Sequence, residues 1–130
     1  MNNHSIIKIS IPPFAVLVFH ILATIIGWYE MFWWFDIPLH FLGGVAIAIS
    51  SIVLFQYFKN INQLEIKWLP LKILLAISLV GLSAVCWEFM EFTFDQIFST
   101  NMQPGIVDTI KDLAVGLTGG IVTALILRNK

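Results

Sequence analysis

Carboxylate and imidazole side chains recur at helical spacing in three separate stretches of this sequence. Within each stretch they lie three, four or seven positions apart, so that they share one face of any helix that contains them. The three sets are Asp36 with His40, Glu88 with Glu91 and Asp95, and Asp108 with Asp112. Inward-facing carboxylate and histidine pairs on neighbouring helices are how helical bundles assemble di-metal sites. The pattern therefore indicates a divalent cation held by three helices.

The candidate metal ligands offer oxygen and imidazole nitrogen, which suit zinc, manganese, iron or magnesium. They are Asp36, His40, Glu88, Glu91, Asp108 and Asp112. Cys86 is the one cysteine, which excludes a cysteine-cluster site of the structural zinc type. If a divalent metal activates a water molecule, Glu88 or Glu91 is the candidate catalytic base.

The same residues also fit roles that need no metal. A carboxylate and histidine network near a membrane surface can relay protons or bind a cationic head group, and closely packed carboxylates would then share protons. The network can equally serve only to hold helices together by hydrogen bonds. Asp36 and Asp108 are also placed to cap helix N-termini, and Asp95 to lie in solvent at the interface.

His20 stands apart from these sets, near the middle of the first apolar run. A lone histidine at that depth is more often a packed, hydrogen-bonded residue than a ligand. It is therefore left outside the candidate site.

The composition around these residues is that of a membrane protein. Of the 130 residues, 58% are hydrophobic and 12% are charged, against about 25% charged in an average soluble domain. With a mean hydropathy of +0.89, a 14.7 kDa globule cannot bury its apolar surface, so that membrane lipid is the expected surrounding and partner. The net charge of −1 excludes the basic surface that nucleic-acid binding requires.

Long uncharged runs predict four transmembrane helices, and hence an all-α integral membrane bundle in a single domain. The expected spans are about 11–31, 37–58, 70–94 and 108–127, with Pro12 and Pro13 at the start of the first. The uncharged parts of the last two, Ile73–Trp87 and Leu113–Leu127, hold about 15 residues each. Such a run reaches about 22 Å, short of the roughly 30 Å hydrocarbon core. These two helices must extend into the segments that carry carboxylates.

Antiparallel packing of the four spans would bring the three polar sets to the same end of the bundle. His40 and Asp112 each follow an aspartate by four residues, which places them about 6 Å inside their helices. Glu88 is the deepest acidic residue of the third span. Small residues on the same faces would let the helices approach closely. They are Gly43, Gly44, Gly116 and Gly120.

Basic residues distinguish the two ends of the bundle. Apart from Lys111, the lysines and arginines lie near the N-terminus, near the C-terminus or in the Lys59–Lys72 connection. The positive-inside rule then places both termini and this connection in the cytoplasm. The first apolar run is too long for a signal peptide and is expected to be retained. We therefore expect a multi-pass protein of the inner (plasma) membrane, with its polar site near the outer face.

Three blocks that contain the candidate residues resemble a known family. They are 35–43 (FDIPLHFLG), 87–92 (WEFMEF) and 108–112 (DTIKD), the last followed by Gly119. In this order they are similar to the YjdF-like family of small bacterial inner-membrane proteins and, more distantly, to VanZ-type proteins. The resemblance covers about residues 33–127. It implies that the six candidate ligands are the matching family positions and that the biochemical function is unassigned.

Two functions from different classes follow from this reasoning. The first is a metal-dependent membrane enzyme, a hydrolase or transferase acting on a lipid or envelope precursor. The second is a non-enzymatic protein that binds a cation or a proton, or supports a partner protein. Four spans are few for a transporter, so that a transport role would require a homo-oligomer. An apolar groove opening sideways from the polar site would favour the enzyme, because a lipid substrate needs access.

Overall fold

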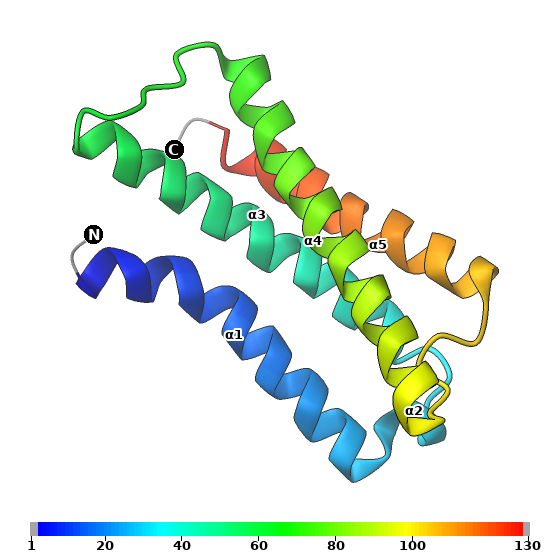
Figure 1. The fold of residues 1–130 in the computed structure, drawn as a ribbon. Helices are drawn as coiled ribbons and strands as arrows, with labels where there is room; N and C mark the ends of the chain where they lie inside the picture. The colour runs from blue at the N-terminus through cyan, green and yellow to red at the C-terminus, as the bar shows by residue number, and fades with distance from the viewer. Residues whose placement is uncertain (1–2, 129–130) are drawn as a thin grey trace.

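The computed structural model describes residues 3–128, and every regular element in that range is helical (Figure 1). Four helices are long: α1 (Asn3–Ile26), α3 (Asp36–Asn60), α4 (Leu69–Phe98) and α5 (Ile106–Ile126). Between the first two lies a single turn, α2 (Trp28–Met31). The predicted all-α class with four long helices is confirmed.

Each of the four long helices is long and apolar enough to cross a membrane. The two with short uncharged parts do take length from polar segments: α4 includes Glu88 and Glu91, and α5 begins before Asp108. Large apolar side chains such as Phe14 and Leu82 are exposed along the helices. This surface is unfavourable in water and suits contact with lipid chains.

α1 begins at Asn3, so that Pro12 and Pro13 lie inside the helix and not at its start. Proline has no N–H group, and Pro13 therefore leaves the carbonyl of Ile9 without its helical hydrogen bond. The hydroxyl of Ser50, on α3, donates to this carbonyl at 2.7 Å. The bond from the neighbouring helix helps to explain why α1 continues through the two prolines.

α1 ends at Ile26, five residues before the end expected for the first span, because Gly27 takes the left-handed conformation with φ of 79°. The chain turns through α2 and enters α3. The rings of Trp28 and Tyr29 pack edge-on against Phe35, with centroids 5.2 and 5.4 Å away. This aromatic packing fixes the end of α1 beside the start of α3.

Glycines let α3 and α5 approach closely. A Cβ atom on Gly44 would lie 1.9 Å from the carbonyl oxygen of Gly116, and one on Gly119 would lie 2.2 Å from that of Phe41. Both distances are far inside van der Waals contact, so that a larger residue requires the helices to separate. The expected close approach is found at Gly44, whereas a Cβ on Gly43 would meet no atom within 4 Å. Gly43 therefore takes no part in the helix contact.

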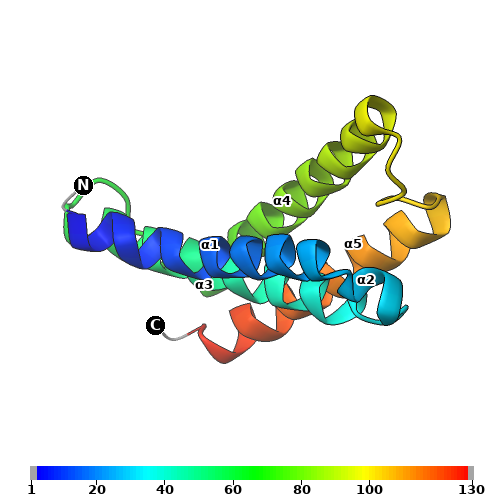
Figure 2. The ribbon, with the colours of Figure 1, turned by 90° about the horizontal axis from the view of Figure 1, so that it is seen from below.

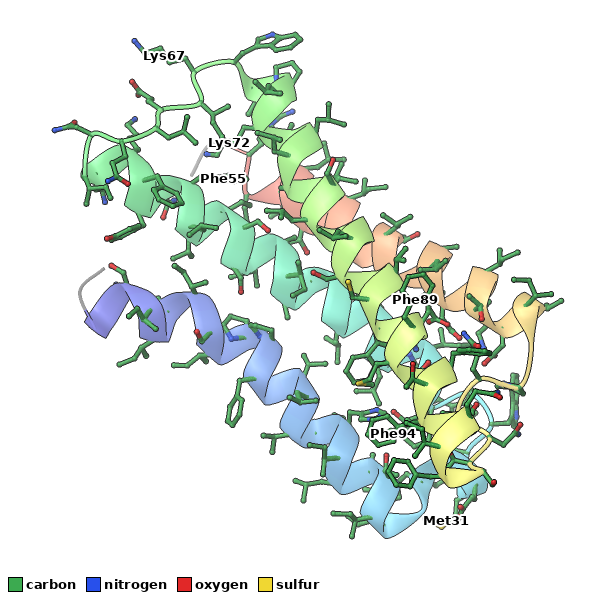
Figure 3. The ribbon with its side chains drawn as sticks, viewed as in Figure 1. Met31, Phe55, Lys67, Lys72, Phe89 and Phe94 are labelled. Carbon is green, nitrogen blue, oxygen red and sulfur yellow. The ribbon has the colours of Figure 1, made fainter. Side chains whose placement is uncertain are left out.

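α3 is the central helix of the bundle. α1 packs against it, while α4 and α5 pack against it and against each other. Figure 2 shows α4 tilted away from α1 and α3, and within residues 3–128 the backbones of α1 and α4 do not come close together. Lys67 and Lys72 lie at the end of the bundle that holds the α3–α4 connection, and Met31 lies at the opposite end (Figure 3). The polar sets belong to the end near Met31.

Candidate functional site: an intramembrane carboxylate and histidine cluster

The structure brings five of the six candidate ligands together. α3 supplies Asp36 and His40 from its first two turns, α4 supplies Glu88 and Glu91 from its C-terminal half, and α5 supplies Asp112. They form two groups, Asp36/His40/Asp112 and His40/Glu88/Glu91, in each of which one ligand atom per residue lies within 4.8 Å of the others. Because His40 belongs to both groups, the five residues form one carboxylate–histidine cluster.

The acidic residues of the cluster are withdrawn from the surface. The exposed fraction is 4% for Glu88, 5% for Glu91 and 2% for Asp112. On insertion scales an aspartate at the centre of a lipid-facing helix costs about 2.5–3.5 kcal/mol. Packing the carboxylates inside the bundle avoids direct exposure to lipid, but each buried carboxylate then needs a proton, a hydrogen-bond donor or a cation.

Glu88 and Glu91 are each held by one donor. The indole Nε1 of Trp87 donates to Glu91 Oε1 at 2.8 Å, and the side-chain amide of Gln103 donates to Glu88 Oε2 at 3.1 Å. The other oxygen of Glu88, Oε1, is buried without a hydrogen-bond partner among the described residues. Buried polar atoms are nearly always satisfied in native proteins. The unpartnered oxygen therefore marks a position where a further ligand would be stabilised.

Asp36 holds the imidazole of His40. Its Oδ1 lies 3.2 Å from His40 Nε2, one helical turn away on α3. A carboxylate that accepts a hydrogen bond from one ring nitrogen fixes the ring orientation and raises the basicity of the other nitrogen. Asp36 can therefore act as the orienting partner of a metal-bound histidine as well as a ligand.

Lys111 occupies the α5 side of the cluster. Its ammonium lies 3.4 Å from Asp112 Oδ1 and 3.9 Å from Asp36 Oδ2, and it donates to Asp108 Oδ1. Asp108 belongs to neither ligand group and is an ion-pair partner of this lysine. In the sequence, Lys111 stood out only as the basic residue predicted at the opposite end of the bundle from the others. Its position three residues after Asp108 was the available signal for this ion pair.

Asp95 organises the loop that follows α4. Its carboxylate accepts hydrogen bonds from the hydroxyl of Thr100 and from the backbone N–H groups of Met102 and Gln103, at 2.6–2.9 Å. The residue is thus a loop cap and lies outside both ligand groups. By fixing the loop it places the Gln103 amide against Glu88.

His20 and Tyr29 form a second polar pair that the sequence did not assign to the site. His20 Nδ1 and the Tyr29 hydroxyl share a hydrogen bond of 2.6 Å, and the His20 ring packs edge-on against Trp87 with centroids 4.9 Å apart. Burial, followed by the nearby carboxylates, raises the pKa of the Tyr29 phenol, which keeps its proton at neutral pH. His20 is hydrogen-bonded, as expected, but it also faces the site. Helical spacing could not predict the hydrogen bond of His20 with Tyr29, because the helix ends at Gly27, between the two residues.

A cavity of about 270 Å³ adjoins the cluster. All four long helices contribute to its lining, which is mostly apolar and includes Val16, Leu17, Ile47 and Val80. Its polar groups are provided mainly by His20, Tyr29, Asp36 and His40. The cavity is partly open to the surroundings. It has the composition of a ligand pocket, with a few polar groups on an apolar wall.

The donor set fits a hard or borderline divalent cation. His40, Glu88 and Glu91 offer one nitrogen and carboxylate oxygens within mutual reach, and one of those oxygens has no other partner. No cysteine takes part, so that the set resembles catalytic metal sites more than structural zinc sites. The arrangement is chemically able to hold a cation beside the polar end of the cavity.

Comparison with known proteins gives a family but no assigned activity. Residues 6–129 match the family described as "Predicted membrane protein (DUF2238)". An uncharacterized protein of Thermotoga maritima is 29% identical over 119 residues, which make up 89% of this chain and 59% of that protein. The chain thus spans less than two thirds of the length of this relative. No solved structure matches the chain.

The family match extends over nearly the whole chain, including the three blocks that hold the cluster residues. It is compatible with the resemblance to YjdF-like proteins, while the more distant likeness to VanZ-type proteins stays a prediction. By this match, the chain belongs to the DUF2238 family of predicted membrane proteins.

Proposed function

We propose that this protein is a metal-dependent membrane enzyme that uses His40, Glu88 and Glu91 to bind a divalent cation. One observation carries the proposal: Glu88 Oε1 is buried and has no hydrogen-bond partner in the described part of the chain, and it belongs to a group whose ligand atoms lie within 4.8 Å of one another. A cation there would satisfy this oxygen and complete the surroundings of the other two residues.

The charge balance supports a cation on the α4 side of the cluster. Lys111 lies near Asp36 and Asp112 and partly offsets their charge. Among the described residues no ion pair involves Glu88 or Glu91, whose hydrogen-bond donors are uncharged side chains. Two buried carboxylates that have no lysine or arginine partner among the described residues would be stabilised by a divalent ion.

The proposed chemistry is hydrolysis or group transfer on a lipid or envelope precursor. A bound divalent metal polarises an ester or phosphoryl oxygen and lowers the pKa of a coordinated water. Asp36 would orient His40, Trp87 would orient Glu91, and Gln103 would orient Glu88. In hydrolysis, Glu88 or Glu91 would accept the proton of the attacking water and return it to the leaving oxygen as the ester or phosphoester bond breaks. The adjoining cavity supplies the access that a lipid substrate needs.

The proposed location is the inner membrane, with both termini in the cytoplasm and the cluster near the outer face. The Lys59–Lys72 connection lies at the end of the bundle away from the cluster, and Arg128 lines a small pocket together with Lys72. Basic residues favour the cytoplasmic side. This orientation would expose the site to precursors of the cell envelope.

A metal-free cation- or proton-binding protein is the second candidate. It is favoured by the ion-pair network of Lys111 with Asp36, Asp108 and Asp112, which joins the Asp36–His40 pair without any metal. Four membrane-spanning helices are few for a transporter, so that a transport role would require a homo-oligomer or a partner subunit.

Elemental analysis of the purified protein separates the two candidates. Wild-type protein should carry a divalent metal near one equivalent, and His40→Ala should lose most of it. His20→Ala is the matched control, because His20 belongs to neither ligand group and should keep the metal. A wild-type protein that stays metal-free after incubation with zinc, manganese, iron and magnesium, followed by desalting, would contradict the enzyme proposal.

A further inference from the structure

We infer that the cavity beside the cluster binds the apolar chain of a membrane lipid, which enters between α1 and α4 with its polar head directed toward His40. The assignment of this lipid as substrate rests on the proposed function; binding of the chain does not. The inference names a substrate class, a lipid with an apolar chain that ends in a polar head.

The first argument is the composition of the cavity. Its walls are mostly apolar side chains, and they contain Gly43, whose missing side chain leaves open space. Apolar cavities do not hold water, and an empty one forfeits the contacts of its lining. In a membrane protein, the apolar groups available to fill such a cavity are the hydrocarbon chains of the surrounding lipid.

The second argument is the route of entry. α1 lines the cavity with Val16 and Leu17, and α4 lines it with Ser83 and Ala84. Within the described residues the backbones of these two helices do not come close together, although the rings of His20 and Trp87 touch. The two helices are instead joined through α3, which also lines the cavity, and Figure 2 shows α4 tilted away from α1. A partly open cavity between two membrane helices whose backbones stay apart would face the lipid, so that a chain could enter sideways beside the contact of His20 with Trp87.

The third argument is the position of the polar groups. The cavity touches two hydrogen-bonded pairs, His20 with Tyr29 from the α1 side and Asp36 with His40 from α3. These pairs offer donors and acceptors to a head group but leave the rest of the wall apolar. If the polar head of the lipid lies at this polar end of the cavity, the bond that joins the head to the chain lies beside the carboxylate–histidine cluster.

The fourth argument is size. At about 30 Å³ for each water-sized group, a cavity of about 270 Å³ takes about nine methylene-sized groups. This is enough for half or more of one straight lipid chain or for two isoprene units, and too little for two chains. The inference therefore commits to a single chain in the cavity.

Photocrosslinking in vesicles tests the inference. The probes are a phosphatidylethanolamine with a diazirine on one acyl chain and a diazirine-bearing isoprenyl phosphate, each in vesicles of phosphatidylethanolamine and phosphatidylglycerol. We expect mass spectrometry to find the crosslinks concentrated on cavity residues such as Leu17 and Ala84. The probe with the higher yield, and competition by its unlabelled form, distinguish an acyl from an isoprenoid chain.

Two variants fill the cavity from different helices. Gly43→Phe places a ring on α3 where a Cβ meets no atom within 4 Å, and Ser83→Phe places one at a residue of α4 that lines the cavity. Both should lose most of the cavity crosslinking. Ser78→Phe is the matched control: Ser78 is exposed on the same helix, does not line the cavity and should leave the yield unchanged.

The distribution of crosslinks in the wild-type protein tests the inference even if Gly43→Phe or Ser83→Phe fails to fold. Crosslinks distributed evenly over outward residues such as Leu82 and Phe89, with no excess on cavity residues, would overturn it. So would well-folded Gly43→Phe and Ser83→Phe proteins that crosslink like wild type. Metal analysis of the same samples keeps the two proposals apart, because concentrated crosslinks in a metal-free protein support chain binding while contradicting the metal enzyme.

Discussion

Gln103 donates its side-chain amide to Glu88 Oε2 at 3.1 Å, and so connects the loop between α4 and α5 to a deeply buried carboxylate of the bundle. The amide leaves Glu88 Oε1 free for another partner. A residue outside the membrane helices thus orients a candidate ligand inside them, in the way that outer-shell partners orient the ligands of metal sites.

The first prediction concerns this contact. Gln103→Leu should weaken divalent metal binding about 10- to 100-fold, because loss of an outer-shell partner typically has that effect. A competition titration against a chelator of known affinity measures the change. Asn101→Leu, an exposed change in the same loop, should leave the affinity unchanged. Equal affinities for wild type and Gln103→Leu would mean that Glu88 is not a ligand held by Gln103.

The second prediction concerns two adjacent glycines. Gly44→Ala should lower the free energy of unfolding by about 3 kcal/mol or more, at the upper end of the usual cost of overpacking, because its Cβ would lie 1.9 Å from the Gly116 carbonyl oxygen. Gly43→Ala should have little effect, because a Cβ there meets no atom within 4 Å. Thermal or denaturant unfolding in detergent micelles compares the two. Similar losses in both would argue against the close approach of α3 and α5.

The third prediction concerns the proline-containing helix. Ser50→Ala removes the hydroxyl that donates to the Ile9 carbonyl, and should destabilise the protein by about 1 kcal/mol, with α1 most affected. Ser51→Ala is the control, because Ser51 bonds to a carbonyl of its own helix. Hydrogen exchange of the α1 amides in each variant gives the measurement. Unchanged protection in Ser50→Ala would show that α1 does not depend on this bond.

The fourth prediction concerns orientation. A reporter fused after Lys130 should behave as cytoplasmic, and one inserted in the 99–105 loop should behave as external, because the basic residues favour the end of the bundle with the Lys59–Lys72 connection. Labelling of engineered cysteines with a membrane-impermeant reagent gives an independent measurement. The opposite pattern would move the cluster to the cytoplasmic face.

Spacing predicted much of the fold and of the cluster. Uncharged runs located the four helices, and the four-residue interval of Asp36 and His40 predicted a shared face that the structure contains. The convergence of Glu88 with His40 followed from depth alone, because antiparallel helices of similar length bring equivalent depths together.

The features of the site that the sequence did not predict depend on contacts between segments that are distant in the sequence. Gln103 and Tyr29 lie in short segments between the long helices, where no periodicity relates them to Glu88 or His20. Helical spacing also treats Gly43 and Gly44 alike, although only Gly44 faces α5. The direction in which a residue points depends on the rotation of its helix against neighbours, which one sequence does not encode in a local pattern.

The central claim is that His40 binds a divalent cation together with Glu88 and Glu91. Pulsed electron paramagnetic resonance of the protein loaded with Mn²⁺ tests it most directly, since a bound imidazole gives a nitrogen coupling to the manganese electron spin. The account predicts this coupling in wild type and in His20→Ala, and its loss in His40→Ala. A bound manganese without nitrogen coupling in wild type, or a coupling that persists in His40→Ala, would contradict the account.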